Sequence, residues 1–152
     1  MPIQCTIVPV TPYQQNCSII KCEVTGKAAI VDPGGDVERI LAAVEQMDAS
    51  VEKIILTHAH LDHCSAADIL RRQLGFPATA AFVPDRWLVQ GDSVMIGEQE
   101  LQVIHCPGHT PGHVVFFYAP QQVAWVGDVL FQGSIGRTDF PKGNYEELIA
   151  SI

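Results

Sequence analysis

The chain of 152 residues carries 9 Lys and Arg against 17 Asp and Glu, a formal net charge of -8, and 47% of its residues are hydrophobic. This length and hydrophobic content predict one globular domain, spanning residues 1–152, with a two-sided core. The acidic balance and the absence of a basic run disfavour nucleic acid and anionic membranes as partners.

The first residues, Met1 to Cys5, lack the basic and apolar regions of a secretion signal, and no apolar run approaches membrane-spanning length. We therefore expect a cytoplasmic protein with no membrane partner. The five cysteines include no Cys-x-x-Cys pair, so neither a disulfide framework nor a zinc ribbon is indicated.

The first third of the chain predicts three strands of an antiparallel meander, because β-prone runs alternate with turn residues. These runs cover residues 6–10, 17–22 and 28–31. Asp32 then ends the third strand in an Asp-Pro-Gly-Gly turn. Making that turn is the ordinary role of such an aspartate, and a supporting place near a metal is the alternative.

A helix and a strand follow this turn. Asp36 is predicted to cap a helix whose apolar residues recur at helical spacing from Val37 to Met47. Val51 to Leu56 is apolar without alternation, which predicts a buried strand. The next helix is predicted to start at Ser65, which forms a capping box with Asp68.

The second half returns to strands, marked by β-prone runs and the turns between them. The predicted strands are residues 79–83, 93–96, 101–105, 114–118 and 123–126. A last helix is expected after Asn144, which is a suitable cap, with Glu147 at the third helical position.

All six histidines lie in two clusters, which are His58, His60 and His63, and His105, His109 and His113. The first cluster directly follows an apolar strand and contains one carboxylate, Asp62. Imidazoles and carboxylates are ligands for zinc and other first-row metals, which activate water. A merely polar surface loop is the simpler interpretation, but it fits this density of histidine less well.

The second cluster lies in a turn that is rich in proline and glycine, so His109 and His113 are not a helical metal pair. One of the two is expected to be a ligand and the other a support. His105, within the predicted strand, is expected to be packed or supporting. Asp128 follows Gly127 at another strand end, where its two oxygens can bridge two cations. If these strands end at one edge, their loops meet there.

Three motifs together resemble the metallo-β-lactamase superfamily, namely Thr-His-Ala-His-Leu-Asp-His at 57–63, Pro-Gly-His-Thr-Pro-Gly-His at 107–113 and Gly-Asp at 127–128. Asp-Pro-Gly-Gly at 32–35 and Gly-Arg-Thr-Asp-Phe at 136–140 resemble its glyoxalase II-like branch of hydroxyacylglutathione hydrolases. The resemblance implies an α/β fold, a four-layer αββα sandwich of two mixed sheets with helices on the outer faces.

The resemblance also implies roles for particular residues. By motif position, the first metal's ligands are His58, His60 and His109, the second metal's are Asp62 and His63, Asp128 bridges both, and His113 and Asp32 support the site. Arg137 matches a position that contacts the glutathione carboxylate, and a solvated arginine is the equal alternative. The implied cofactor is Zn²⁺, one or two ions per chain, with iron or manganese as alternatives.

Two departures accompany the resemblance. No histidine follows His113, although the family's second metal takes a ligand from a late Pro-Gly-His turn. By comparison with the family, we also expect the chain to lack the family's C-terminal segment. A weak second metal site is therefore expected.

The function implied is metal-dependent hydrolysis of a small-molecule thioester, an acyl-glutathione such as S-lactoylglutathione, with Asp62 and Asp128 as the catalytic carboxylates that orient the attacking hydroxide. One alternative is a mononuclear iron persulfide dioxygenase that uses His58, His109 and Asp128. A second is a non-catalytic or incomplete metal-binding domain. A β-lactamase is disfavoured by the lack of an export signal. The sequence leaves the oligomeric state open.

Overall fold

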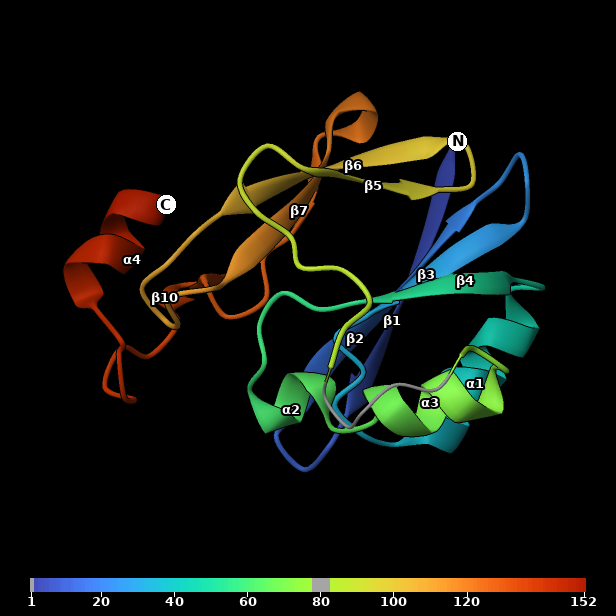
Figure 1. The fold of residues 1–152 in the computed structure, drawn as a ribbon, viewed down its shortest axis with the longest axis horizontal. Helices are drawn as coiled ribbons and strands as arrows, with labels where there is room; N and C mark the ends of the chain where they lie inside the picture. The colour runs from blue at the N-terminus through green and yellow to red at the C-terminus, as the bar shows by residue number, and fades with distance from the viewer. Residues whose placement is uncertain (1, 78–82) are drawn as a thin grey trace. The chain divides into compact units, whose positions relative to one another are not determined.

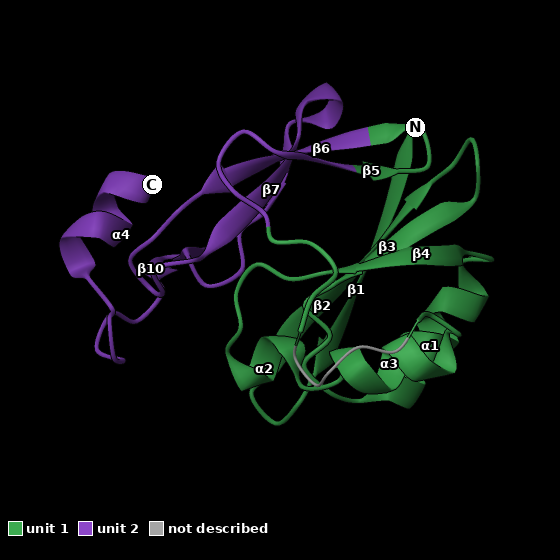
Figure 2. Ribbon diagram, viewed as in Figure 1, with its two compact units in different colours: residues 1–87, 95–99 green, residues 88–94, 100–152 purple. Residues whose placement is uncertain are grey.

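The computed structural model describes residues 2–77 and 83–152 (Figure 1). The chain divides into two compact units, shown in Figure 2. Unit 1 comprises residues 1–87 and 95–99, and unit 2 comprises residues 88–94 and 100–152. The single domain predicted for residues 1–152 stays a prediction.

Unit 1 contains a sheet with the strand order β1-β2-β3-β4. The strands are β1 (Ile3–Val10), β2 (Gln15–Cys22), β3 (Lys27–Val31) and β4 (Ser50–Ile55). The first three are antiparallel neighbours, which confirms the predicted meander. β4 pairs in parallel with β3 after a crossover through α1 (Val37–Gln46), so both strands end at the same edge of the sheet.

Helices α1 and α3 (Ala67–Gln73) share one apolar core with this sheet. Ile40 of α1, Leu70 of α3 and Ile19 of β2 are fully buried. Each such side chain contributes roughly 1.5–3 kcal/mol through burial. The core therefore holds the end of β4 in place, and the first histidine cluster directly follows that end.

Two local predictions for unit 1 were wrong in detail. β4 is half-buried and only Ile55 is buried, and among the strands of residues 2–77 and 83–152 it stands at the end of its sheet. Asp36 has left-handed backbone angles, with φ 51 and ψ 50, and makes no side-chain cap to α1. Its carboxylate instead accepts the Thr11 backbone N–H at 2.8 Å, which ties α1 to the β1–β2 turn.

The capping box predicted at Ser65 was also wrong. The chain forms a short helix α2 (Leu61–Cys64), which ends at Ser65, and α3 starts after Ala66 without a side-chain cap. The hydroxyl of Ser65 donates to the Leu61 carbonyl of α2. The histidine loop therefore enters a helix four residues earlier than the pattern indicated.

Unit 2 carries most of a sheet with the order β5-β6-β7-β8. Its strands are β5 (Ser93–Ile96), β6 (Gln99–His105), β7 (Val114–Tyr118) and β8 (Val123–Trp125). A 3-10 turn, η1 (Ala119–Gln121), joins β7 to β8, and β9 (Leu130–Phe131) and β10 (Ser134–Ile135) form a small hairpin. The strand predicted at 79–83 falls almost entirely on residues 78–82, which lie outside the described residues.

The last helix, α4 (Tyr145–Ser151), packs on the turn that carries His109. Asn144 caps it as predicted, because its side-chain oxygen accepts the Glu147 N–H at 3.1 Å. The Asn144 N–H donates to the Gly108 carbonyl at 2.7 Å. A Cβ at Gly108, where φ is 138, would lie 2.3 Å from Leu148 backbone atoms, so only glycine permits this approach.

Among residues 2–77 and 83–152, the helices are all too short or too polar to cross a membrane.

Candidate metal centre

Unit 1 brings the first histidine cluster together. His58 follows the end of β4, His60 immediately precedes α2, and His63 lies within α2. The ring centroid of His58 lies 4.9 Å from that of His60 and 4.2 Å from that of His63. His58 and His63 are buried and His60 is half-buried. The three imidazoles of this cluster therefore lie close together.

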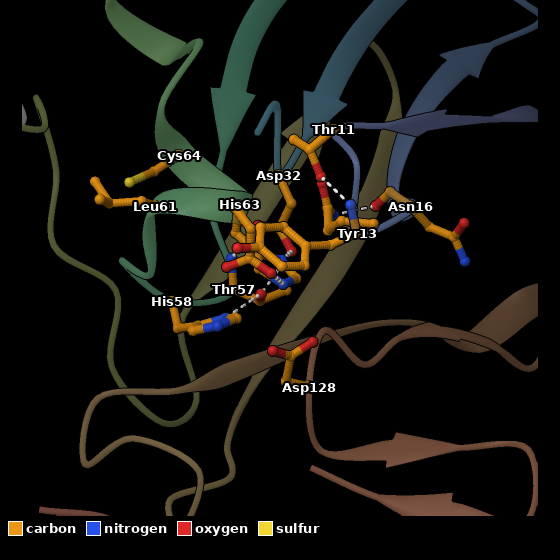
Figure 3. A network of polar contacts seen from close by, with 12 residues as sticks. Thr11, Tyr13, Asn16, Asp32, Thr57, His58, Leu61, His63, Cys64 and Asp128 are labelled. Carbon is orange, nitrogen blue, oxygen red and sulfur yellow. Dashed lines mark hydrogen bonds and ion pairs between the residues drawn. The ribbon is translucent and has the colours of Figure 1, made fainter. Parts of the chain in front are cut away.

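Asp32 is the buried anchor behind these histidines (Figure 3). Its Oδ1 accepts the Thr57 backbone N–H at 2.7 Å. Its Oδ2 accepts the Thr57 hydroxyl at 2.6 Å and faces the His63 Nδ1 at 3.0 Å. Asp32 thus does more than make a turn, because it links the end of β3 to the histidine loop.

These contacts fix which nitrogen of each imidazole carries hydrogen. A carboxylate oxygen only accepts, so His63 Nδ1 must be the donor to Asp32. The Thr57 hydroxyl already donates its one hydrogen to Asp32, so its oxygen accepts from His58 Nδ1, 3.0 Å away. Both rings, when neutral, therefore present the Nε2 lone pair, which is the form that binds a metal.

Asp62 completes the group in unit 1. Its Oδ2 lies 3.5 Å from His63 Nε2. Its backbone carbonyl packs against Gly34, where an added Cβ would lie 1.7 Å from the carbonyl oxygen. Gly34 therefore lets the turn after β3 approach the histidine loop without displacing Asp62.

In unit 2, a hydrogen-bond partner likewise fixes the ring of His109, which faces Asp128. His109 Nδ1 lies 2.6 Å from the Arg137 backbone carbonyl, which can only accept, so this nitrogen carries the hydrogen. His109 Nε2 then faces Asp128 Oδ2 at 3.1 Å. A lone pair and a carboxylate so close repel each other unless a proton or a cation lies between them. The pair therefore has the donor chemistry of a metal site.

The two remaining histidines are held by other contacts. His113 is fully buried, and its Nε2 accepts the Asp128 backbone N–H at 3.1 Å. This bond uses the lone pair of Nε2, and the role of His113 as a support of the site stays a prediction. His105, expected to be packed or supporting, is exposed, and its Nε2 lies 2.7 Å from the Pro111 carbonyl, bracing the turn.

Arg137 is engaged by two neighbours in unit 2. Its Nε and Nη2 donate to Asp139 Oδ1 and Oδ2, each at 2.7 Å. Its guanidinium carbon lies 3.9 Å from the centre of the Phe140 ring. The ion pair raises the pKa of Arg137 and lowers the pKa of Asp139. Arg137 is therefore an exposed arginine that is paired with Asp139 and stacked on Phe140, and its role in substrate binding stays a prediction.

Sequence reasoning missed two residues of this region, Thr57 and Asp139. Thr57 joins Asp32 to His58, and Asp139 holds Arg137. A signal existed for both, because a hydroxyl directly before a ligand histidine can accept from its ring. Opposite charges two residues apart, in a segment with Gly136 and Pro141, can likewise meet in a turn.

The comparisons with known proteins agree with a metal site built from histidines and aspartates. The model of the metallo-β-lactamase superfamily matches residues 10–81 and 77–152. Hydroxyacylglutathione hydrolase GloC of Haemophilus influenzae is 42% identical over 172 aligned residues, which cover 96% of this chain and 81% of that protein.

Two solved structures are similar over nearly the whole chain. The BLEG-1 B3 metallo-β-lactamase is 33% identical with a TM-score of 0.89, covering 98% of this chain and 83% of that one. TTHA1623, solved in a di-iron-bound form, is 30% identical with a TM-score of 0.77, covering 96% and 83%. The predicted fold class is therefore confirmed. This chain belongs to the metallo-β-lactamase superfamily, in its hydroxyacylglutathione hydrolase-like branch of hydrolases.

Proposed function

We propose that this chain hydrolyses thioesters with the help of bound metal, and that its substrates are acyl-glutathiones of the S-lactoylglutathione type. The observation that carries the proposal is the fixed hydrogen pattern of His58, His63 and His109, each of which presents Nε2 for a cation. The relative from Haemophilus influenzae, a hydroxyacylglutathione hydrolase, supports the choice of substrate.

The proposed ligands follow the order of the family's motifs along the chain. His58, His60 and His109 would hold a first metal, Asp62 and His63 would hold a second, and Asp128 would serve both. Zn²⁺ is the proposed ion, with iron or manganese as alternatives. The family model matches segments of both units, which supports drawing ligands from each.

When bound, a divalent metal supplies Lewis-acid activation of water and of the thioester carbonyl. The chain's own carboxylates do the positioning. The side chains of Asp62 and Asp128 are 31% and 18% exposed, so both can accept hydrogen bonds from an attacking water and orient it. A thiolate is a good leaving group, because thiols are far more acidic than alcohols, so the reaction has little need of a strong general acid.

The test is thiol release from S-lactoylglutathione by the zinc-loaded chain and by two variants, His58→Ala and Asp128→Asn. We expect each variant to lose roughly a hundredfold to a thousandfold in kcat/KM, since each removes a ligand. Circular dichroism checks that both still fold. Full activity in either folded variant refutes the ligand assignment. Because one structural relative is a β-lactamase, a chromogenic β-lactam serves as the counter-substrate, and its faster hydrolysis refutes the substrate class.

One observation favours a second candidate, the mononuclear iron dioxygenase acting on a persulfide. The proposed ligands His58, His109 and Asp128 form the two-histidine, one-carboxylate set that mononuclear iron takes, whereas the proposed second metal would have a single histidine, His63. If this second candidate is correct, the iron-loaded chain consumes oxygen with glutathione persulfide and leaves thioesters intact. Metal analysis with both assays separates the two functions.

A further inference from the structure

The carboxylate of Asp139 already binds one side of the Arg137 guanidinium, the cationic group expected to contact the substrate. It takes the Nε and Nη2 hydrogens of Arg137 in a two-point contact, with both distances at 2.7 Å. Both side chains are exposed, at 57% for Arg137 and 67% for Asp139. The pair is therefore open to water and to an incoming anion.

This pair lies beside a proposed metal ligand within the same unit. The backbone carbonyl of Arg137 accepts from His109, and the Phe140 ring lies 6.0 Å from the His109 ring. The guanidinium of Arg137 stacks on that same Phe140 ring. The guanidinium of Arg137 therefore lies on the same Phe140 ring that neighbours the ring of His109.

We infer that Asp139 is a specificity-determining residue that competes with a substrate carboxylate for Arg137. The inference deepens the proposed function and rests on it. A ligand carboxylate that seeks the two-point face of Arg137 must displace Asp139, since a fork of two N–H groups binds one carboxylate at a time. A ligand that approaches the remaining N–H groups instead meets the negative charge of Asp139 nearby.

The exchange is feasible because exposed ion pairs are weak. Such pairs contribute little to stability, as water and salt compete for both partners. Stacking on Phe140 keeps the guanidinium in place while its anion changes. Wild-type protein is therefore expected to distinguish poorly between a thioester of glutathione and one whose glycine carboxylate is blocked as an amide.

The experiment compares Asp139→Asn with Asp85→Asn as a matched control. Asp85 is also an exposed aspartate paired with an arginine, because both its oxygens accept from the Nη2 of Arg71, so its substitution makes the same change in charge. The probes are S-hexylglutathione, which has no thioester to cleave, and its glycine amide. Calorimetry on the zinc-loaded proteins gives the Kd of each probe, and S-lactoylglutathione turnover gives KM and kcat.

We expect Asp139→Asn to tighten binding of S-hexylglutathione by about threefold to tenfold and to change binding of the amide by less than about twofold. Its KM for S-lactoylglutathione falls while kcat stays within about twofold. Asp85→Asn changes none of these values. If Asp139→Asn weakens the binding of both probes or lowers kcat, Asp139 only braces the His109 segment, and the inference is overturned.

The binding arm separates this inference from the proposed function. If S-lactoylglutathione is not hydrolysed but the probe still binds more tightly to Asp139→Asn, the proposed function fails and the competition stands. If neither probe binds to wild type or to the variant, the inference is overturned. If the amide gains as much as the acid, the competition for Arg137 is wrong even where turnover is normal.

Discussion

Substituting Asp32 by asparagine tests the idea that this buried carboxylate sets the metal-binding form of the first histidine cluster. Asp32 accepts from the Thr57 N–H and hydroxyl, and from His63 Nδ1. An asparagine keeps one oxygen but places two N–H donors where the other oxygen was. At least one of the present donors must then face another donor.

The expected loss follows from these contacts. Hydrogen bonds to a charged group contribute roughly 1.5–3 kcal/mol each, and neutral ones roughly 0.5–1.5 kcal/mol. One bond of Asp32 is lost and two are weakened, while the removal of a buried charge offsets part of the loss. We expect Asp32→Asn to lower the free energy of unfolding by about 2–4 kcal/mol. Zinc affinity falls by roughly 10-fold to 100-fold, since the contacts that fix the hydrogens of the His58 and His63 rings become weaker.

Thr57→Val separates the two branches of this network. Valine matches threonine in shape but removes the hydroxyl that accepts from His58 Nδ1, and it leaves the Asp32 contact with His63 intact. We expect a smaller loss of stability, about 1–2 kcal/mol, with a loss of zinc affinity similar in size to that of Asp32→Asn.

Urea unfolding with a chelator present measures the stability of each variant, and competition with a coloured zinc indicator measures affinity. Wild-type zinc affinity in Asp32→Asn, together with an unfolding free energy within about 0.5 kcal/mol of wild type, would show that the network has no bearing on the site.

Three further results are expected. Burial alone would raise the pKa of Glu52, but the Gly97 N–H bond holds it below its ordinary value of 4.5. The ionised carboxylate therefore stabilises the wild-type protein above pH 4.5, and this stabilisation is lost as the pH falls through the lowered pKa. Urea midpoints measured against pH should show this loss in wild type and not in Glu52→Gln. Gly34→Ala should displace Asp62 and destabilise the chain by about 2 kcal/mol or more, whereas Gly112→Ala, with open space around it, stays within about 0.5 kcal/mol in the same urea assay. Elemental analysis after desalting should find about one metal ion per chain, because the proposed second ligand set has a single histidine, His63, against three in the first.

Much of the sheet architecture could be predicted from local pattern. The bounds of β5 and β7 agree with the predicted strands at residues 93–96 and 114–118. Both are β-prone runs closed by clear turn residues, so the boundary is decided within a few positions. The cap at Asn144 succeeded for the same reason, because its partner Glu147 is three residues away.

The failed prediction of a cap at Asp36 has the opposite cause, a partner that is distant in sequence. Asp36 is a good helix cap by residue type, but its carboxylate bonds Thr11, which is 25 positions earlier. Nothing local reveals that contact. The small hairpin of β9 and β10 was also missed, because strands of two residues carry no alternation that a pattern could detect.

The proposed ligand histidines could be named from sequence, but the groups that hold their rings in the metal-binding form could not. A histidine binds a cation only when a hydrogen-bond partner holds its other nitrogen in the right form. For His63 that partner is Asp32, 31 positions earlier, and for His109 it is the Arg137 carbonyl, 28 positions later. A backbone carbonyl has no letter of its own in a sequence. Any residue at 137 offers the same oxygen, so the side chain of Arg137 is free to serve binding while its backbone positions His109. Substitutions at 137 should therefore be read as tests of substrate recognition, and substitutions at 32 as tests of the metal site.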